Sequence, residues 1–166
     1  DACKQVEQPL IRFERPFGNH CGVNSINDVA ELSRVNLEGQ RILMAIGARH
    51  LASASKFAQE SGALVFARVL PSAQSLIKSL TSKISENNLA VINPMQGDPI
   101  GEIESALCRK WGITLVLCRD SGGPTQDLWH SVCKGNKIDL LLISRPKTFF
   151  NVEVVFNSQD LIDRIT

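Results

Sequence analysis

The stretch DPIGEIESALCRKWGITLVLCRDSGGP, residues 98–124, decides the fold because it predicts a helix, a strand and a glycine turn in succession. Asp98 and Pro99 are residue types that begin a helix, and Gly112 is typical of a helix end. Between them, apolar residues recur at helical spacing and form one stripe: Ile100, Ile103, Ala106, Leu107 and Trp111. The run at 113–118 is apolar at nearly every position, as in a strand covered on both faces. We therefore predict a helix over 98–111 followed by a buried strand.

The same alternation of apolar runs and amphipathic stretches extends over the rest of the chain. Strands are predicted at 9–15, 41–46, 63–69, 89–93, 113–118 and 139–144. Helices are predicted at 25–34, 49–60, 72–82, 98–111, 125–134 and 158–165. In the first helix Ser25 would be the N-cap, with Asp28 at the capping-box position. The predicted fold class is α/β, with a mainly parallel central sheet flanked by helices in a three-layer arrangement of the Rossmann or flavodoxin type.

Length and charge exclude several classes of protein. A chain of 166 residues with 43% hydrophobic residues can bury one substantial core. Its net charge of +1 gives no basis for binding nucleic acid or an anionic membrane. No apolar run approaches the roughly 18 residues of a membrane span. The cysteines form no CxxC motif, which favours a reduced, cytoplasmic protein over a disulfide framework or a zinc knuckle: Cys3, Cys21, Cys108, Cys118 and Cys133.

Glycines cluster where the predicted strands end. Open parallel sheets bind ligands at the carboxyl ends of their strands, and the helix that follows presents unpaired N–H groups to an anion there. Glycine in such a turn lets the backbone approach a ligand closely. The predicted contacts for a phosphate are Gly47, Gly97, Ser121, Gly122 and Gly123. An ordinary tight connection between strand and helix is the alternative for a lone Ser-Gly-Gly turn.

Other polar residues support weaker predictions. His20 and Cys21 are adjacent, which is a poor arrangement for a metal, and no metal site is predicted. A Cys/His hydrolase would need a nucleophile and a base whose pairing the sequence does not reveal, so the catalytic residues stay unassigned. Glu102 and Glu104 lie two positions apart and therefore point to different faces of the predicted helix.

A longer segment resembles a known family. MQGDPIGEIESALCRKWGITLVLCRDSGGPTQDLWHSVCKGNKIDLLLISRP, residues 95–146, is similar to the C-terminal half of the precorrin-6A reductases, also called cobalt-precorrin-6A reductases. That family has a glycine turn, a helix with glutamates, a strand ending in Ser-Gly-Gly and a later strand ending in Arg-Pro. Upstream, ACKQVEQPLIRFERP (2–16), AIGARHLA (45–52) and ARVLPS (67–72) resemble further segments of the same family. The resemblance spans nearly the whole chain.

The resemblance implies an activity and two sets of contacts. Members of the family use NADPH to reduce a double bond of a ring-contracted corrin precursor, a tetrapyrrole macrocycle fringed with acetate and propionate groups. The implied cofactor is therefore NADPH, held at the glycine turns, and the implied substrate is a tetrapyrrole. Four arginines at strand ends would pair with its carboxylates, with a solvated charge or a local ion pair as the alternative for each: Arg49, Arg68, Arg119 and Arg145.

The chain departs from the family pattern at three places. Residues 97–100 are Gly-Asp-Pro-Ile in place of Gly-Pro-Phe-Ser. Residues 126–129 are Gln-Asp-Leu-Trp in place of Thr-Glu-Ala-Lys, so a positive contact is lost. Trp129 is expected in the core, with a platform for a ring as the alternative. The family also begins with a glycine-rich NADPH-binding loop that has no counterpart here, so the resemblance implies a reductase without its first portion.

These departures shape the expected domains and leave two functions open. Residues 1–22 are expected to be a remnant of the preceding portion or an edge strand, and residues 23–166 a C-terminal Rossmann-like domain. The missing N-terminal portion of the same enzyme is then a partner of this chain. The alternative function is a non-catalytic α/β domain for ligand binding or interaction that keeps the reductase scaffold. The missing loop favours this alternative, whereas the retained Ser-Gly-Gly and Arg-Pro turns favour the reductase.

Overall fold

The chain forms two compact units. The computed structural model describes residues 2–18, 22–146 and 152–165. Unit 1 comprises Asp1–Phe17 and Pro146–Thr166, and unit 2 comprises Gly18–Arg145. Both clusters of buried apolar side chains lie in unit 2, so the main hydrophobic core belongs to it.

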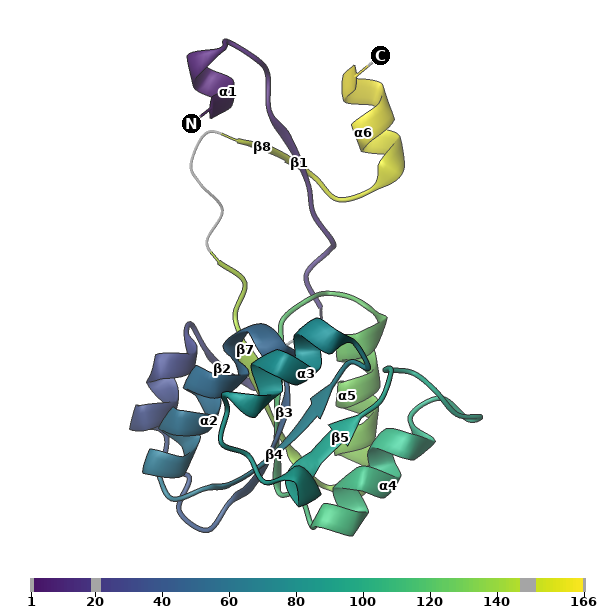
Figure 1. The fold of residues 1–166 in the computed structure, drawn as a ribbon. Coiled ribbons are helices and arrows are strands. Elements are labelled where there is room, and N and C mark those ends of the chain that lie inside the picture. The colour runs from purple at the N-terminus through teal and green to yellow at the C-terminus, as the bar shows by residue number, and fades with distance from the viewer. Residues whose placement is uncertain (1, 19–21, 147–151, 166) are drawn as a thin grey trace. The chain divides into compact units, whose positions relative to one another are not determined.

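A six-stranded sheet forms the centre of unit 2, and all of its neighbouring strands are parallel (Figure 1). Its order is β2-β7-β6-β3-β4-β5. The strands are β2 (Asn24–Ile26), β3 (Arg41–Ala45), β4 (Leu64–Val69), β5 (Leu89–Val91), β6 (Leu115–Arg119) and β7 (Asp139–Ile143). The strands predicted between residues 41 and 144 are therefore confirmed, and so is the predicted α/β class with a parallel central sheet.

The order of the strands reverses direction once, between β3 and β6. From β3 the chain crosses to β4 and then to β5 on one side, and it returns to β6 and β7 on the other side of β3. In doubly wound sheets, ligands bind at the carboxyl ends of the two strands where the order reverses. The ends of β3 and β6 are therefore the place where a ligand is expected.

Helices cover both faces of this sheet. Successive residues of β3 alternate between two buried clusters, because side chains of a strand point to opposite faces in turn: Ile42 and Met44 in one, Leu43 and Ala45 in the other. The first cluster is completed by η1 (Val29–Arg34) and α2 (Leu51–Glu60). The second is completed by α4 (Glu102–Trp111) and α5 (Pro124–Asn136). The result is three layers, with the sheet in the middle.

The prediction of a helix over 25–34 is wrong. Residues Asn24–Ile26 form β2, in which Ser25 lies opposite Leu142 of β7 instead of capping a helix. The 3₁₀ helix η1 begins at Val29, and its N-cap is Asp28, whose side chain accepts a hydrogen bond of 2.8 Å from the N–H of Ala30. The apolar spacing of this segment is compatible with a helix throughout, so pairing with β7 is what limits the helix to its second half.

Helix α4 begins four residues later than predicted. It starts at Glu102 because Gly101 has a φ of 96°, which does not continue an α-helix. A Cβ at Gly101 would lie 2.8 Å from Cδ1 of Leu128, so glycine is required for this close approach to α5. Asp98 and Pro99 therefore precede the helix, and Ile100 is 62% exposed instead of belonging to the apolar stripe. The helix ends at Gly112, as predicted.

The remaining helices of unit 2 occur where they are predicted. α2 is preceded by a short 3₁₀ turn, η2 (Ala48–His50). Ser72 is the N-cap of α3 (Ala73–Leu80) and accepts a hydrogen bond of 3.3 Å from the N–H of Ser75. A third 3₁₀ turn, η3 (Glu86–Asn88), leads into β5. Among the residues that the structure describes, no helix is both long enough and apolar enough to cross a membrane.

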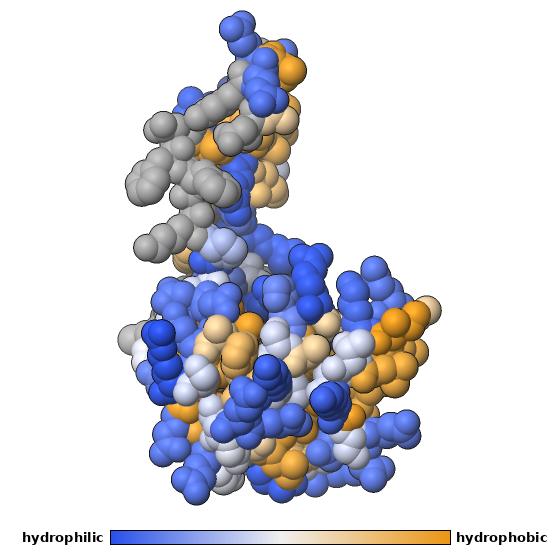
Figure 2. All heavy atoms as spheres, turned by 60° about the vertical axis from the view of Figure 1, so that its left-hand side comes forward, coloured by the Kyte–Doolittle hydropathy of each residue, from blue (hydrophilic) through white to orange (hydrophobic). Residues whose placement is uncertain are grey.

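Unit 1 is formed by the two ends of the chain. β1 (Ile11–Phe13) pairs in parallel with β8 (Glu153–Val155), so the strand and the closing helix predicted in these regions are present. α1 (Ala2–Gln5) precedes β1, and α6 (Ser158–Ile165) follows β8. Figure 2 shows hydrophobic side chains of this unit at the molecular surface. The expected domains 1–22 and 23–166 stay a prediction.

Candidate functional site

The carboxyl ends of β3 and β6 are tied together by one side chain. Arg119, the last residue of β6, donates a hydrogen bond of 3.1 Å from Nε to the backbone oxygen of Ile46, which follows β3. In the ladder between the two strands, Ala45 lies opposite Cys118. The turns after β3 and β6 therefore leave the sheet next to each other.

The turn after β3 leaves open space beside Gly47. The φ of Gly47 is 77°, and no atom lies within 4 Å of the position that a Cβ would take there. Gly47 is the N-cap of η2, and no side chain caps this helix start. Arg49 lies exposed in the same turn and makes no hydrogen bond or ion pair with the described residues. The turn thus combines an accessible backbone with a cation.

The turn after β6 leads directly into the start of α5. Gly122 has a φ of 58°, and the N-cap is Gly123, which has no side chain to accept from the first-turn amides. Pro124 follows at the first helical position. Unpaired amides and the positive end of the helix dipole favour an anion at such a helix start. Ser121 lies partly buried at the beginning of this turn.

One amide of this turn is already used by a buried side chain that the sequence analysis did not select. The N–H of Gly122 donates a hydrogen bond of 2.7 Å to Oε1 of Gln126, which is 1% exposed. The other end of that side chain, Nε2, lies 3.4 Å from Nε2 of His130. A glutamine three residues after an N-cap is the signal that predicts this contact. Gln126 thus fixes the conformation of the turn.

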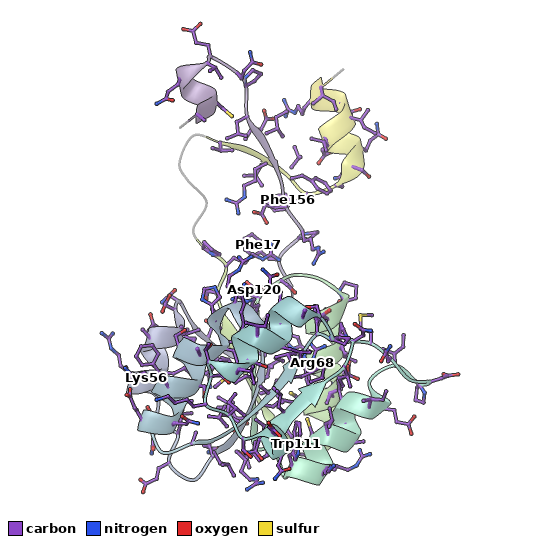
Figure 3. All side chains as sticks on the ribbon, viewed as in Figure 1. Phe17, Lys56, Arg68, Trp111, Asp120 and Phe156 are labelled. Atoms are coloured by element: carbon purple, nitrogen blue, oxygen red, sulfur yellow. The ribbon has the colours of Figure 1, made fainter. Side chains whose placement is uncertain are left out.

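Arg68 is the most buried of the four arginines that were predicted to bind substrate. It is 8% exposed near the end of β4, and its Nε and Nη1 have no hydrogen-bond partner among the described residues. Its guanidinium carbon lies 6.0 Å from the centre of the Trp129 ring. Burial lowers the pKa of Arg68, whereas nearby Glu104 and Cys118 raise it. Figure 3 shows Arg68 on its strand in unit 2.

Glu104 supplies negative charge to the buried surroundings of Arg68. It is fully buried on α4, while Glu102 is exposed, so the two carboxylates lie on different faces as predicted. Its Oε1 accepts a hydrogen bond of 3.1 Å from the N–H of Met95, in the loop before the helix. Its Oε2 has no hydrogen-bond partner in the described part of the chain. Trp129 is fully buried in the cluster beneath α4 and α5, as expected for a core residue.

Arg145 supports the turn after β6 from the neighbouring strand. It follows β7 and donates a hydrogen bond of 3.0 Å from Nε to the backbone oxygen of Asp120. The same Nε lies 3.8 Å from Oδ1 of Asp120, as an ion pair. The N–H of Asp120 in turn donates to the backbone oxygen of Ile143, at 2.9 Å. Asp120 is therefore fixed by the backbone at the end of β7 and by the side chain of Arg145, which follows this strand.

The predicted site residues fall into two groups by position. Seven lie at or after the carboxyl ends of β3, β6 or β7, the strands at and next to the reversal: Gly47, Arg49, Arg119, Ser121, Gly122, Gly123 and Arg145. Arg68 lies in β4, and Gly97 lies after β5, the edge strand, which is separated from β3 by β4. Gly97 has a φ of 99°, and its nearest side chain is that of Ile103, which would be 3.4 Å from a Cβ.

Metal binding has no structural support in the described part of the chain. No group of three or more His, Cys, Asp or Glu side chains lies close enough there to hold an ion. His20 and Cys21, which were weighed as metal ligands, lie outside the described residues. The described cysteines on the core strands and helices are Cys108, Cys118 and Cys133, and burial raises the pKa of each to about 11, 12 and 12.

Comparisons with known proteins agree on one family. Residues 1–166 match the family described as precorrin-6x reductase CbiJ/CobK. A cobalt-precorrin-6A reductase from Synechocystis sp. (strain ATCC 27184 / PCC 6803 / Kazusa) is 32% identical over 152 residues, which cover 87% of this chain and 56% of that protein. A solved structure described as CobK precorrin-6A reductase has a TM-score of 0.75 and 17% sequence identity, and the match covers 99% of this chain and 64% of that one. The chain thus spans about half the length of the curated relative.

Proposed function

The chain belongs to the precorrin-6x reductase family CbiJ/CobK, and we propose that it forms part of an enzyme that uses NADPH to reduce a double bond of precorrin-6A or cobalt-precorrin-6A. The reaction belongs to cobalamin biosynthesis, and we propose a cytoplasmic location for it. Because the chain spans 56% of its curated relative, this activity is assigned to the complete enzyme. The N-terminal portion of the same enzyme would be its partner.

The observation that carries this proposal is the pair of glycine turns at the reversal of the sheet. Gly47 leaves open space after β3, and α5 starts after β6 without a capping side chain. Arg119 joins the two turns through Ile46. These features fit the pyrophosphate of a dinucleotide, which needs close backbone approach and unpaired amides. When bound, NADPH would supply the hydride, and the role of these residues is to hold it in place.

The arginines are proposed to differ in what they contribute to a polycarboxylate substrate. Arg49 is exposed at the open turn, which suits a carboxylate at the entrance of the site. The side chain of Arg119 uses Nε for Ile46 and makes no other hydrogen bond with the described residues, so its terminal nitrogens can bind an anion. Arg145 positions the turn after β6 through Asp120. Arg68 would offer a desolvated cation, for which pairing with a carboxylate is strongest.

A non-catalytic domain for ligand binding or interaction is the second candidate. It is favoured by one observation: the chain covers 56% of the curated relative and 64% of the solved structure, so the family fold contains further polypeptide. Hydride transfer requires the nicotinamide and the reacting carbon to be held about 3 to 3.5 Å apart. A cleft formed from two portions holds both partners only when both portions are present. The two candidates therefore differ in whether this chain alone supports turnover.

The deciding experiment is a titration of the 166-residue chain with NADPH, followed by a turnover assay with precorrin-6A. We expect a folded protein with weak binding and little oxidation of the cofactor. Each charged hydrogen bond that the other portion would supply is worth roughly 1.5 to 3 kcal/mol, so two or three losses change a micromolar affinity to a millimolar one. Micromolar binding with measurable turnover would show that this chain is sufficient. If NADPH binds neither this chain nor the enzyme completed with the remaining portion, NADPH is not the cofactor.

A further inference from the structure

A cavity of about 450 Å³ is lined by α5 and by the amino ends of β2 and β7. His130 and Lys134 of α5 form one wall, and Val23, Ile138 and Leu140 lie opposite them. The glycine turns of the candidate site follow the carboxyl ends of the strands, so this cavity lies toward the other end of the sheet. Its volume is within the range of pockets that hold small organic molecules.

The floor of the cavity is apolar. Val23, Ile138 and Leu140 are partly buried and pack against the cluster of apolar side chains beneath α4 and α5. Asp139 also borders the cavity, but the side chains of a strand alternate between the two faces of the sheet. Asp139 therefore shares the opposite face with Leu141, which belongs to the other buried cluster. Its carboxylate points away from the apolar floor, which can bury the nonpolar part of a ligand.

The wall formed by α5 carries a positive charge. His130 and Lys134 are one helical turn apart, so both side chains lie on the same side of α5. Lys134 is exposed, and its ammonium group makes no hydrogen bond or ion pair with the described residues. A ligand that lies against this wall can therefore pair with a cation.

A chain of hydrogen bonds in one direction leads from the turn after β6 into the cavity. The N–H of Gly122 donates to Oε1 of Gln126 at 2.7 Å, so the other end of this side chain is an NH₂ group, which can only donate. That group lies 3.4 Å from Nε2 of His130, which must accept, and we therefore assign the ring proton to Nδ1. Among the described residues, Nδ1 of His130 has no hydrogen-bond partner. The last donor of the chain is thus available to an acceptor in the cavity.

We propose that this cavity binds a small organic carboxylate, with its apolar part on the floor and its carboxylate on His130 and Lys134. One neutral donor and one cation match a single negative charge. The ligand would be a molecule separate from the proposed tetrapyrrole, which would bind at the carboxyl ends of the strands. An acceptor on Nδ1 polarises the whole chain of hydrogen bonds and strengthens the bond between Gly122 and Gln126. Binding in the cavity would therefore be sensed at the turn after β6.

The test is an NMR titration of the 166-residue chain, labelled with a nitrogen isotope, with hexanoate, hexanol and acetate as probes. Hexanoate combines an apolar chain with a carboxylate, whereas hexanol lacks the charge and acetate lacks the apolar chain. Hexanoate should bind at least about tenfold more tightly than either of the others. The amide signals of residues 23, 130–134 and 138–140 should shift, together with that of Gly122. These measurements involve neither NADPH nor turnover, so their outcome is independent of the proposed function.

Variants separate the two polar contacts of the ligand. Lys134→Gln should weaken hexanoate binding by about tenfold, whereas Lys110→Gln, a control at an exposed lysine of α4, should not. His130→Phe keeps an aromatic ring but removes both nitrogens, so hexanoate should no longer shift the Gly122 signal. The nitrogen chemical shifts of the His130 ring should place its proton on Nδ1 in the chain without a probe.

Four results would overturn the inference. They are binding of hexanol or acetate as tightly as hexanoate, shifts confined to residues outside the cavity, a ring proton on Nε2 of His130, and unchanged hexanoate affinity in Lys134→Gln. If His130→Phe does not fold, the Lys134→Gln variant and the position of the ring proton still decide the matter, because neither measurement alters the buried side chains.

Discussion

The side chain of Gln126 accepts the hydrogen bond that the N–H of Gly122 would otherwise offer to a ligand, at 2.7 Å. The amide oxygen of Gln126 thus accepts from a backbone N–H that the proposed phosphate would otherwise use in the turn after β6. A carbonyl oxygen carries only a partial negative charge, so a phosphate can compete with it or use the neighbouring amides of the α5 start. The side chain of Gln126 therefore holds the turn in a conformation that would also suit the proposed phosphate.

The variant Gln126→Glu should weaken binding of NADPH by about tenfold, or about 1.4 kcal/mol. The carboxylate would accept the same hydrogen bond more strongly and would repel the pyrophosphate. The control Gln126→Ala removes the competing oxygen without adding charge, so its affinity should be equal to or higher than that of the original chain. Calorimetric titration of the three proteins measures the difference. Equal weakening by both substitutions would show that the side chain acts through the shape of the turn and not through charge.

Substitutions of the two glycines on either side of β3 distinguish an effect on ligand binding from an effect on backbone conformation. Gly47 and Gly39 have φ values of 77° and 73°, and a Cβ at either would enter open space. Gly47 has a ψ of 169°, a combination with its φ that is essentially restricted to glycine, so alanine there should lower the free energy of unfolding by about 1 to 3 kcal/mol. Gly39→Ala, which also places alanine at a positive φ, should lower it by about 1 to 2 kcal/mol. Gly39 precedes β3 and Gly47 follows it, so the two glycines lie at opposite ends of this strand. Only Gly47→Ala should weaken binding of NADPH, and a parallel loss in Gly39→Ala would contradict the location of the site.

Replacement of Glu104 by Gln should destabilise the protein through Arg68. The substitution keeps an oxygen for the N–H of Met95 but removes the negative charge near a buried guanidinium. We expect the free energy of unfolding to fall by about 1 to 3 kcal/mol in urea denaturation. The matched control is Glu102→Gln on the exposed face of the same helix, which should change it by less than about 0.5 kcal/mol. Equal stability of both variants would mean that Glu104 does not compensate the charge of Arg68.

Three buried thiols should make stability fall in alkaline solution. Burial raises the pKa of Cys108 to about 11 and that of Cys118 and Cys133 to about 12, from a reference value of 9.0. Folded-state pKa values above the unfolded value mean that the stabilisation is complete below pH 9 and is lost as the pH rises toward 11 to 12. Above pH 9 each thiol should contribute a loss of up to about 1.4 kcal/mol per pH unit, because the unfolded chain releases the proton first.

Denaturation curves between pH 8 and 10 measure this loss, and Cys118→Val provides the control. The valine variant should show a shallower decline with pH, because one titrating group is removed. Because the three thiols are buried, they should also resist reaction with a water-soluble disulfide reagent at pH 8 until denaturant is added. Rapid labelling of any of them in the folded protein would contradict the burial on which their pKa values depend.

The strands at the centre of the sheet are predictable because both of their faces are covered. β3, β4 and β6 are therefore apolar at nearly every position, and a pattern of that kind has few other structural meanings. β2 is different, since its sequence Asn-Ser-Ile is mostly polar at the edge of the sheet and only pairing with β7 defines it. The start of α4 escaped prediction because the conformation of Gly101 depends on Leu128, which is distant in sequence.

The candidate site shows the same limit. The positions of Gly47 and Gly122 follow from the order of strands and turns, which the sequence indicates through its alternation of elements. The burial of Arg68 depends on how α4 and α5 pack over β4, and no local pattern specifies that packing. The contact between Gln126 and Gly122 is local, and the spacing from the helix start would have indicated it.

The pairing of β1 with β8 sets an order of events during synthesis on the ribosome. Residues 11–13 are synthesised before unit 2, and their partner strand, residues 153–155, is synthesised after it. All the strands of unit 2 lie between them, so β1 stays without its partner strand while the whole of unit 2 is synthesised. Until then β1 is an unpaired strand with Phe13 exposed, which is the kind of segment that chaperones bind and that aggregates when released too early. A released chain that ends at Arg145 would contain the whole of unit 2 but would leave β1 in that state permanently.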